Sequence, residues 1–308
     1  MGLCNRQFKP EPLPSDKIDG MRACRLKFAV LPLVLAAFVL APPALASRDA
    51  GLAALQVALQ SRGIYDGSID GVKGPATTKA IKRFQRSAGL PADGVPGPKT
   101  RRALGAYGTH LLGSRPLTRG AAGWDVAALQ FLLAWHGFPS ATIDGGLGMH
   151  TERALRRFQR WAGLKPDGVA GDSTYAALRG APPTCPIALA WPLAAPVGDT
   201  FGPRGNRFHA GIDLVAPRGA PVAAAAAGRV VFAGFALGGW GNLVIVAHAS
   251  GVKTMYAHLA TVSVHRTELV AVGARLGTVG ATGHANGPHL HFEVRLRGAA
   301  VDPRSALP

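Results

Sequence analysis

Hydrophobic residues in the middle of the chain recur at helical spacing in two separate stretches, 55–104 and 129–178. On the second predicted helix of each stretch, apolar side chains at i, i+3 and i+7 form one buried stripe. The stripe comprises Ile81, Phe84 and Ala88 in the first stretch and Leu155, Phe158 and Ala162 in the second. Pro75 and Pro98 suit the first turn of a helix, and Asp-Gly pairs suit the turns between helices. Each stretch therefore predicts three short helices.

The two stretches are copies of one module. An offset of 74 residues aligns them without a gap and pairs Asp70-Gly71 with Asp144-Gly145. A unit of roughly 60 residues is small for a hydrophobic core, and such repeated units usually serve as binding modules. A row of arginines lies on the second helices: Arg83, Arg86, Arg157 and Arg160. A saccharide-facing surface and a solvated helix face explain this row equally well, so it predicts no binding site.

The pattern changes to strands after residue 190. Stretches 228–234, 241–248, 252–259 and 289–296 are β-branched or alternate apolar with polar residues, and glycine-rich breaks separate them. Residues 248–251 suit the turn of a hairpin. We therefore expect a multidomain chain, with two small all-α three-helix modules followed by an all-β antiparallel-sheet domain.

The N-terminal segment has the pattern of an export signal. Basic residues precede the apolar run 28–40, and Ala44-Leu45-Ala46 fits the cleavage rule for small residues. The run is too short to span a bilayer, which needs about 20 residues. We predict a cleaved signal over residues 1–46, with an alternative start at Met21, and no membrane anchor.

The predicted domains follow from these changes of pattern. They are a first module at 47–107, a linker at 108–117, a second module at 118–179, a linker rich in proline and small residues at 180–190, and the C-terminal domain at 191–308. Beyond the signal the chain keeps one cysteine, Cys185, so no internal disulfide can form. Cys185 lies outside every motif, which argues against thiol catalysis.

The chain is strongly basic, with a formal net charge of +17 and a pI near 10.8. Its lysines and arginines are spread along the sequence, and no nucleic-acid-binding motif is present, so we expect no nucleic-acid partner. An anionic polymer outside the cell, such as a bacterial wall, would be attracted by the same charge.

Two histidines stand one residue apart in the motif GPHLHFEV, residues 287–294. The spacing alone does not separate a metal site from an ordinary strand, because it also arises by chance. On a strand His289, His291 and Glu293 share one face. Two imidazoles about 6–7 Å apart on a rigid strand suit one metal ligand beside one acid or base.

Further donors come from two other motifs. NRFHAGIDL supplies His209 and Asp213, and Gly211 between them lets the backbone bend so that both side chains turn inward. MYAHL places His258 at the end of a strand. Two imidazoles and a carboxylate leave one tetrahedral position open for water, as in catalytic zinc sites. The remaining histidines could move protons or stabilise an oxyanion.

Two families share these patterns. The repeated spacing of Leu-Gln, Asp-Gly, Phe-Gln and Thr in residues 55–104 and 129–178 resembles the peptidoglycan-binding repeat of wall hydrolases. The motifs FGPRGNRFHAGIDL, YAHL and GPHLHFE, in this order, resemble the lysostaphin-type zinc endopeptidases over the whole C-terminal domain. This second resemblance implies antiparallel sheets with a substrate groove and cleavage of peptide bonds in peptidoglycan.

The resemblance to the zinc endopeptidases also implies roles for particular residues. His209, Asp213 and His291 would hold one zinc ion. His258 and His289 would line the open side, orient the water and stabilise the tetrahedral intermediate. All these positions carry the required residue types, which favours an active enzyme.

The residues predict a secreted zinc endopeptidase that cleaves bacterial peptidoglycan in the wall or the periplasm, with a monomer favoured. One alternative is a non-enzymatic wall-binding protein that activates other wall hydrolases, since some members of the family have lost ligands. Another is a peptidase for exported proteins, which the duplicated module disfavours. The motifs do not indicate which bond is cleaved.

Five further residues lie outside this set, and three of them have two interpretations each. Glu293 either orients an imidazole or belongs to the strand periphery, and Trp240 either forms a wall of the groove or packs on a glycine-rich turn. His248 is expected at a strand end, facing solvent or supporting the site. His265 and His284 are expected on the surface.

Overall fold

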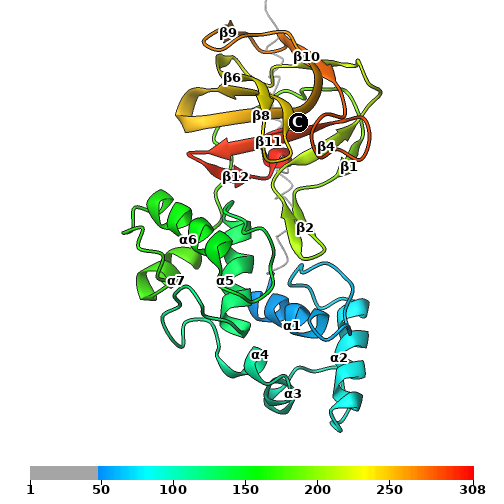
Figure 1. The fold of residues 1–308 in the computed structure, drawn as a ribbon, viewed down its shortest axis with the longest axis vertical. Helices are drawn as coiled ribbons and strands as arrows, with labels where there is room; N and C mark the ends of the chain where they lie inside the picture. The colour runs from blue at the N-terminus through cyan, green and yellow to red at the C-terminus, as the bar shows by residue number, and fades with distance from the viewer. Residues whose placement is uncertain (1–47) are drawn as a thin grey trace, which may run out of the picture. The chain divides into compact units, whose positions relative to one another are not determined.

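The computed structural model describes residues 48–308, in which helices come first and strands follow (Figure 1). The predicted export signal and its alternative start lie outside the described residues. The first module contains α1 (Ala50–Gln60), α2 (Pro75–Ser87), α3 (Pro98–Ala103) and a one-turn α4 (Ala106–Thr109); the second contains α5 (Trp124–Trp135), α6 (Met149–Trp161) and α7 (Asp172–Leu178). The three predicted helices of each module are confirmed, and α4 is an addition. Over residues 48–308, no helix is both long enough and apolar enough to cross a membrane.

The polar residues that recur in the repeat form a partly buried network. Gln56 Nε2 donates to Asp70 Oδ1 at 2.6 Å and to Thr77 Oγ1 at 3.2 Å, while Gln56 Oε1 accepts from the Gly71 N–H at 2.9 Å. The same arrangement recurs at Gln85, Asp93 and Thr100, at Gln130, Asp144 and Thr151, and at Gln159, Asp167 and Thr174. These residues hold the turn after each helix, so their repetition reflects folding and not ligand contact.

The two modules share one hydrophobic core through α1 and α5. Residues 53–59 of α1 are all buried, on every side of the helix. One cluster joins them to Trp124, Ala128 and Phe131 of α5. A module of this size has little interior of its own, and the shared helix contact supplies the missing burial. Leu117, at the end of the predicted linker, is also fully buried and pairs with Ala170.

The C-terminal region is an antiparallel sheet, as predicted. Its strands are β1 (Val197–Asp199), β4 (Ile212–Val215), β5 (Pro221–Ala223), β6 (Gly228–Ala236), β7 (Gly241–Ala247), β8 (Val252–Val262), β9 (Leu269–Val270), β10 (Arg275–Val279), β11 (His289–Leu296) and β12 (Ala299–Val301). The main order is β1-β4-β11-β8-β7-β6-β9, with β10 beside β5 and β8, and β12 beside β11. A separate hairpin pairs β2 (Gly202–Arg204) with β3 (Arg207–His209). The short 3-10 turns are η1 (Ala249–Gly251), which joins β7 to β8 at the predicted hairpin turn, and η2 (Pro303–Ser305).

Alternation along β11 separates a core face from a polar face. Leu290, Phe292 and Val294 are fully buried in the main core of the sheet. His289 and His291 therefore project from the other face. The register places His291 directly opposite Asp213 of β4, so both side chains stand on the same side of the sheet.

A bulge in β8 brings His258 onto the polar face. Tyr256 and Leu259 lie in the main core, whereas Ala257 is paired with His291 on the other face. Strict alternation would place His258 in the core beside Tyr256. Instead the register of β8 against β7 shifts at this point, and His258 adopts φ 60° in the left-handed region.

The β2–β3 hairpin is held at its tip by backbone hydrogen bonds. The Ile69 N–H donates to Gly205 O at 2.9 Å, and the Ile143 N–H donates to Asn206 O at 2.7 Å. The described residues 48–308 belong to one compact unit, and these bonds lie within it. The hairpin ends at His209, so the same bonds help to fix that histidine.

Candidate metal centre

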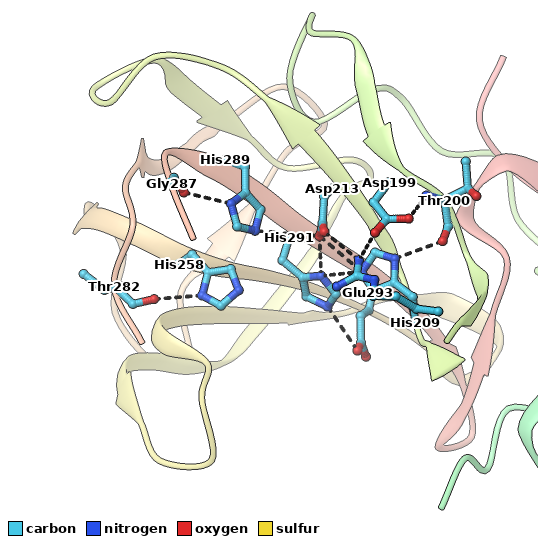
Figure 2. A network of polar contacts seen from close by, with 11 residues as sticks. Asp199, Thr200, His209, Asp213, His258, Thr282, Gly287, His289, His291 and Glu293 are labelled. Atoms are coloured by element: carbon cyan, nitrogen blue, oxygen red, sulfur yellow. Dashed lines mark hydrogen bonds and ion pairs between the residues drawn. The ribbon is translucent and has the colours of Figure 1, made fainter. Parts of the chain in front are cut away.

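Three side chains from three strands bring one atom each to a common point (Figure 2). His209 lies at the end of β3, Asp213 on β4 and His291 on β11. His291 Nδ1 is 2.7 Å from Asp213 Oδ1 and 3.0 Å from His209 Nε2. His209 Nε2 is 3.2 Å from Asp213 Oδ1. Within residues 48–308 this is the group of ligand-type side chains close enough to hold one metal ion.

Hydrogen bonds outside this triangle fix both imidazole tautomers. His209 Nδ1 lies 3.0 Å from the Thr200 carbonyl oxygen, which can only accept, so the ring proton sits on Nδ1. His291 Nε2 donates to Glu293 Oε1 at 3.2 Å. When both rings are neutral, as metal binding requires, the lone pairs of His209 Nε2 and His291 Nδ1 point toward each other and toward Asp213. Histidine ligands of metals are oriented in this way by partners on the far nitrogen.

Two carboxylates make this cluster attractive to a cation. Burial acts to raise the pKa of Asp213, but its close contacts with the imidazoles of His209 and His291 outweigh burial and hold that pKa well below its ordinary value. Burial lowers the pKa of His291, but its bonds to Asp213 and Glu293 prevail and raise that pKa to about 9. At neutral pH a proton thus occupies the centre in the absence of another cation. A metal ion would displace it.

The donor set and its spacing fit zinc. Zinc binds imidazole nitrogen and carboxylate oxygen at about 2.0–2.2 Å, so tetrahedral ligand atoms are about 3.3–3.5 Å apart. The observed separations of 2.7, 3.0 and 3.2 Å are shorter by about 0.1 to 0.8 Å. Small outward movements of the three side chains would admit the ion. Arg204 Nη2 lies 3.0 Å from Asp213 Oδ2, which leaves Oδ1 as the oxygen directed at the centre.

A cavity of about 590 Å³ opens beside the three ligand atoms. His258 and His289 line it together with His291, and the rings of His258 and His289 are 4.9 Å apart between centroids. His258 Nδ1 donates to Thr282 O at 2.8 Å, and His289 Nδ1 donates to Gly287 O at 2.9 Å. Figure 2 shows the two bonds to these carbonyl groups. Because they occupy Nδ1, Nε2 of each ring is the atom available to a bound substrate.

The environment of His258 favours its neutral form. Burial lowers the pKa of His258, and the nearby rings of His291 and His289 act in the same direction. The bond to Thr282 opposes this lowering but does not cancel it. A neutral imidazole with a free Nε2 can accept a proton near pH 7.

The five side chains predicted from the motifs thus lie around one centre. His284 is exposed, as predicted, and it also lines the cavity. The chain bends at Gly211, between β3 and β4, as predicted, although this glycine has no left-handed φ. Gly211 also permits close approach to β11, because a Cβ there would lie 2.3 Å from Phe292 O.

The remaining interpretations are now resolved by position. Glu293 is buried, accepts from His291 and is paired with Arg295 at 2.6 Å, so it orients the imidazole. Trp240 lines the cavity, with its ring 5.7 Å from that of His291. His248 bonds to Ala227 O at 2.9 Å and is absent from the cavity lining.

Sequence reasoning missed four supporting groups. Thr200, Thr282 and Gly287 contribute only their carbonyl oxygens, which any residue type could supply. Arg204 bonds to Asp213 and also pairs with Asp199. It stands in the motif FGPRG among many arginines of the chain, and nothing in the spacing marks it.

Comparison with known families agrees with this geometry. The model of Peptidase family M23 matches residues 207–303. The model described as "Putative peptidoglycan binding domain" matches residues 48–104 and 123–178. The first match contains the three ligand-type side chains and both cavity histidines.

This chain spans less than a third of the length of three curated relatives that it matches. Cell division protein DipM of Caulobacter vibrioides is 42% identical over 127 residues, which cover 39% of this chain and 21% of DipM. DD-carboxypeptidase/endopeptidase Mpg of Neisseria meningitidis serogroup B is 50% identical over 103 residues, 33% of this chain and 24% of Mpg. Murein hydrolase activator NlpD of Escherichia coli is 41% identical over 120 residues, 38% of this chain and 31% of NlpD.

Both family matches follow the order that the motifs predicted, helical repeats first and the peptidase domain last. The chain therefore carries a domain of peptidase family M23 behind two helical domains of the peptidoglycan-binding type.

Proposed function

We propose that this chain is a secreted, zinc-dependent endopeptidase that cleaves peptide bonds of bacterial peptidoglycan. The observation that carries the proposal is the convergence of two imidazole lone pairs and one carboxylate oxygen beside an open cavity. In this proposal His209, Asp213 and His291 hold one zinc ion, and His258 and His289 act on the substrate.

Zinc bound at this centre would supply Lewis acidity, which lowers the pKa of water and polarises a carbonyl group. The protein's own part is to move protons and to hold the substrate. His258 is neutral near pH 7 and offers Nε2 to the cavity, so it can accept a proton from the attacking water. His289 Nε2 faces the same space and can stabilise the oxyanion once it carries a proton. Glu293 and Thr200 keep the ligand rings oriented.

The helical modules would hold the enzyme on its insoluble substrate. Two weak contacts with the same polymer raise the effective concentration of the attached catalytic domain. The basic character of the chain adds attraction to an anionic wall, which salt would weaken. An export signal over residues 1–46 would deliver the protein outside the cytoplasm.

The second candidate is a wall-binding activator of other hydrolases. Its support is the similarity to NlpD, which is named a murein hydrolase activator. Mpg, named a carboxypeptidase and endopeptidase, has the higher identity of 50%. The complete set of ligand-type residues and the neutral His258 favour the enzyme, because an activator needs neither.

The test is cleavage of purified peptidoglycan by residues 47–308, with released fragments identified by mass spectrometry. We expect new peptide termini that disappear with a chelator, return with added zinc, and are lost in His289→Ala. His265→Ala is the matched control, because His265 is exposed and paired with Glu268 outside the cavity. A folded, zinc-loaded protein that cleaves no wall type would favour the activator instead. A protein without bound zinc would favour it as well.

A further inference from the structure

Each helical module has a basic pocket at the same place. In the first module it lies between the chain that follows α1, residues 63–66, and one face of α2, with a volume of about 280 Å³. In the second it lies between residues 139–141, after α5, and the corresponding face of α6, with a volume of about 470 Å³. Figure 1 shows α2 and α6 as the second helix of each module.

The two pockets are equivalent by the internal repeat. The 74-residue offset pairs the lining residues Tyr65 with Pro139, Asp66 with Ser140, Ala76 with His150, Lys79 with Arg153, and Arg83 with Arg157. On each helix these positions follow the i, i+3, i+7 spacing of one face. A solvated helix face would not by itself form a hollow at the same five positions in both copies.

The pocket of the second module is rich in cations that no carboxylate neutralises. Among residues 48–308, no acidic side chain lies within ion-pair distance of Arg153, Arg157 or Arg160. Arg156 also lines the pocket, but it is paired with Glu152 at 2.9 Å. The three arginines without an acidic partner are therefore the side chains that indicate an anionic ligand.

One of these arginines is held at the pocket wall. Arg157 Nη2 donates to Pro139 O at 3.3 Å, across the opening between α6 and the chain that follows α5. Partial burial and the like charge of Arg295 lower the pKa of Arg157. A bound anion would relieve both penalties. The pocket of the first module is less basic, since Asp66 lines it beside Lys79 and Arg83.

We propose that each pocket binds a carboxylate of a peptidoglycan stem peptide, and that the second module binds it more tightly. This inference deepens the wall anchoring described above and rests on it. The guanidinium group matches a carboxylate with two parallel hydrogen bonds. Volumes of about 280 and 470 Å³ lie near the lower range of small-ligand sites, which suits a short peptide segment.

A phosphodiester polymer of the wall also carries negative charge that arginine could bind. The test therefore distinguishes binding to carboxylates from binding to phosphodiester groups. The protein is residues 47–308 carrying His289→Ala, so that the wall is not cut while binding is measured. Sedimentation with insoluble peptidoglycan gives the dissociation constant. One sample of wall has its carboxyl groups chemically amidated, and another has its phosphodiester polymers removed with hydrofluoric acid.

The decisive variants each remove two positive charges, one pair from each pocket and one pair from outside both pockets. Arg153→Gln with Arg157→Gln should raise the dissociation constant about tenfold or more, because charge-assisted bonds to the ligand are lost. Lys79→Gln with Arg83→Gln should have a smaller effect. Lys165→Gln with Arg179→Gln is the control, since both residues are exposed in the second module and line neither pocket. All these side chains lie at the surface, and unchanged thermal midpoints would show intact folding.

The possible results separate the ideas. Amidation of the wall should weaken binding of the parent and remove the difference between parent and Arg153→Gln/Arg157→Gln. Equal losses in that variant and in the control would overturn the pocket and leave general charge attraction. Loss of binding after hydrofluoric acid would overturn the carboxylate and point to the phosphodiester. A parent that binds no wall would refute the anchoring itself, whereas absence of cleavage with intact binding would refute only the enzyme.

Discussion

His258 adopts a left-handed backbone conformation, and the energetic cost of this conformation can be measured separately from the loss of the imidazole group. This residue has φ 60° within β8, whereas His289 has no positive φ. We therefore compare glycine and alanine at each of the two positions. Both substitutions remove the imidazole, so the loss of its contacts cancels within each pair.

The expected difference follows from the backbone. A side chain with a Cβ in the left-handed region costs about 1–2 kcal/mol, which His258→Gly relieves and His258→Ala does not. Glycine loses more freedom on folding, which costs about 0.5–1 kcal/mol at any strand position. His258→Gly should thus be more stable than His258→Ala by about 0.5–1 kcal/mol. At His289 the order should reverse, with alanine more stable by about 0.5–1 kcal/mol.

Urea unfolding of the metal-free proteins measures these free energies without a contribution from zinc binding. All four variants should lose wall cleavage, and the two His258 variants should still bind one zinc ion because His258 is not one of the proposed ligands. A His258→Gly protein no more stable than His258→Ala would refute the strain argument. Loss of zinc from either His258 variant would contradict the assignment of ligands.

Three further predictions concern the metal, the backbone and pH. Zinc affinity should fall by about tenfold per pH unit as the pH drops below about 9, because a proton then binds His291, whose pKa is raised to about 9 by its bonds to Asp213 and Glu293, and zinc must displace it; a competition titration with a fluorescent chelator measures this, and a constant affinity would contradict it. Gly211→Ala should destabilise the protein by about 1–3 kcal/mol, since the new Cβ would lie 2.3 Å from Phe292 O; an unchanged urea midpoint would show that the backbone can yield. Burial lowers the pKa of His136 below its ordinary 6.5 although its Nε2 donates to Leu178 O. The unfolded chain therefore binds a proton that the folded chain excludes, and stability is lost as the pH falls below about 6.5. His136→Gln should reduce this loss in thermal unfolding at pH 5 and 7, and equal losses in both proteins would argue against it.

The helical modules were predictable because their signals are local. Spacing along α2 and α6 identified Phe84 and Phe158 as buried, and both are. The prolines at the start of α2 and α3 and the Asp-Gly turns act over a few residues of chain. The burial of α1 on all sides was not predictable, because half of it depends on α5, which follows more than 60 residues later.

Four residues of the site were also readable from the sequence. Alternation along β11 places His289 and His291 on one face, and the bend at Gly211 lets His209 and Asp213 turn inward together. His258 shows where that reasoning ends. Alternation in β8 would bury it beside Tyr256, and only the bulge against β7 turns it to the cavity.

Residue types and their local spacing determined which side chains could bind a metal or move a proton. The tertiary structure decided their state, because tautomers depend on acceptors brought from distant strands and loops. Thr200 fixes the proton of His209, and Thr282 fixes that of His258. Arg204 selects the oxygen of Asp213 that faces the centre. Hydrogen bonds of this kind act over about 3 Å in space and leave no periodic trace in the sequence.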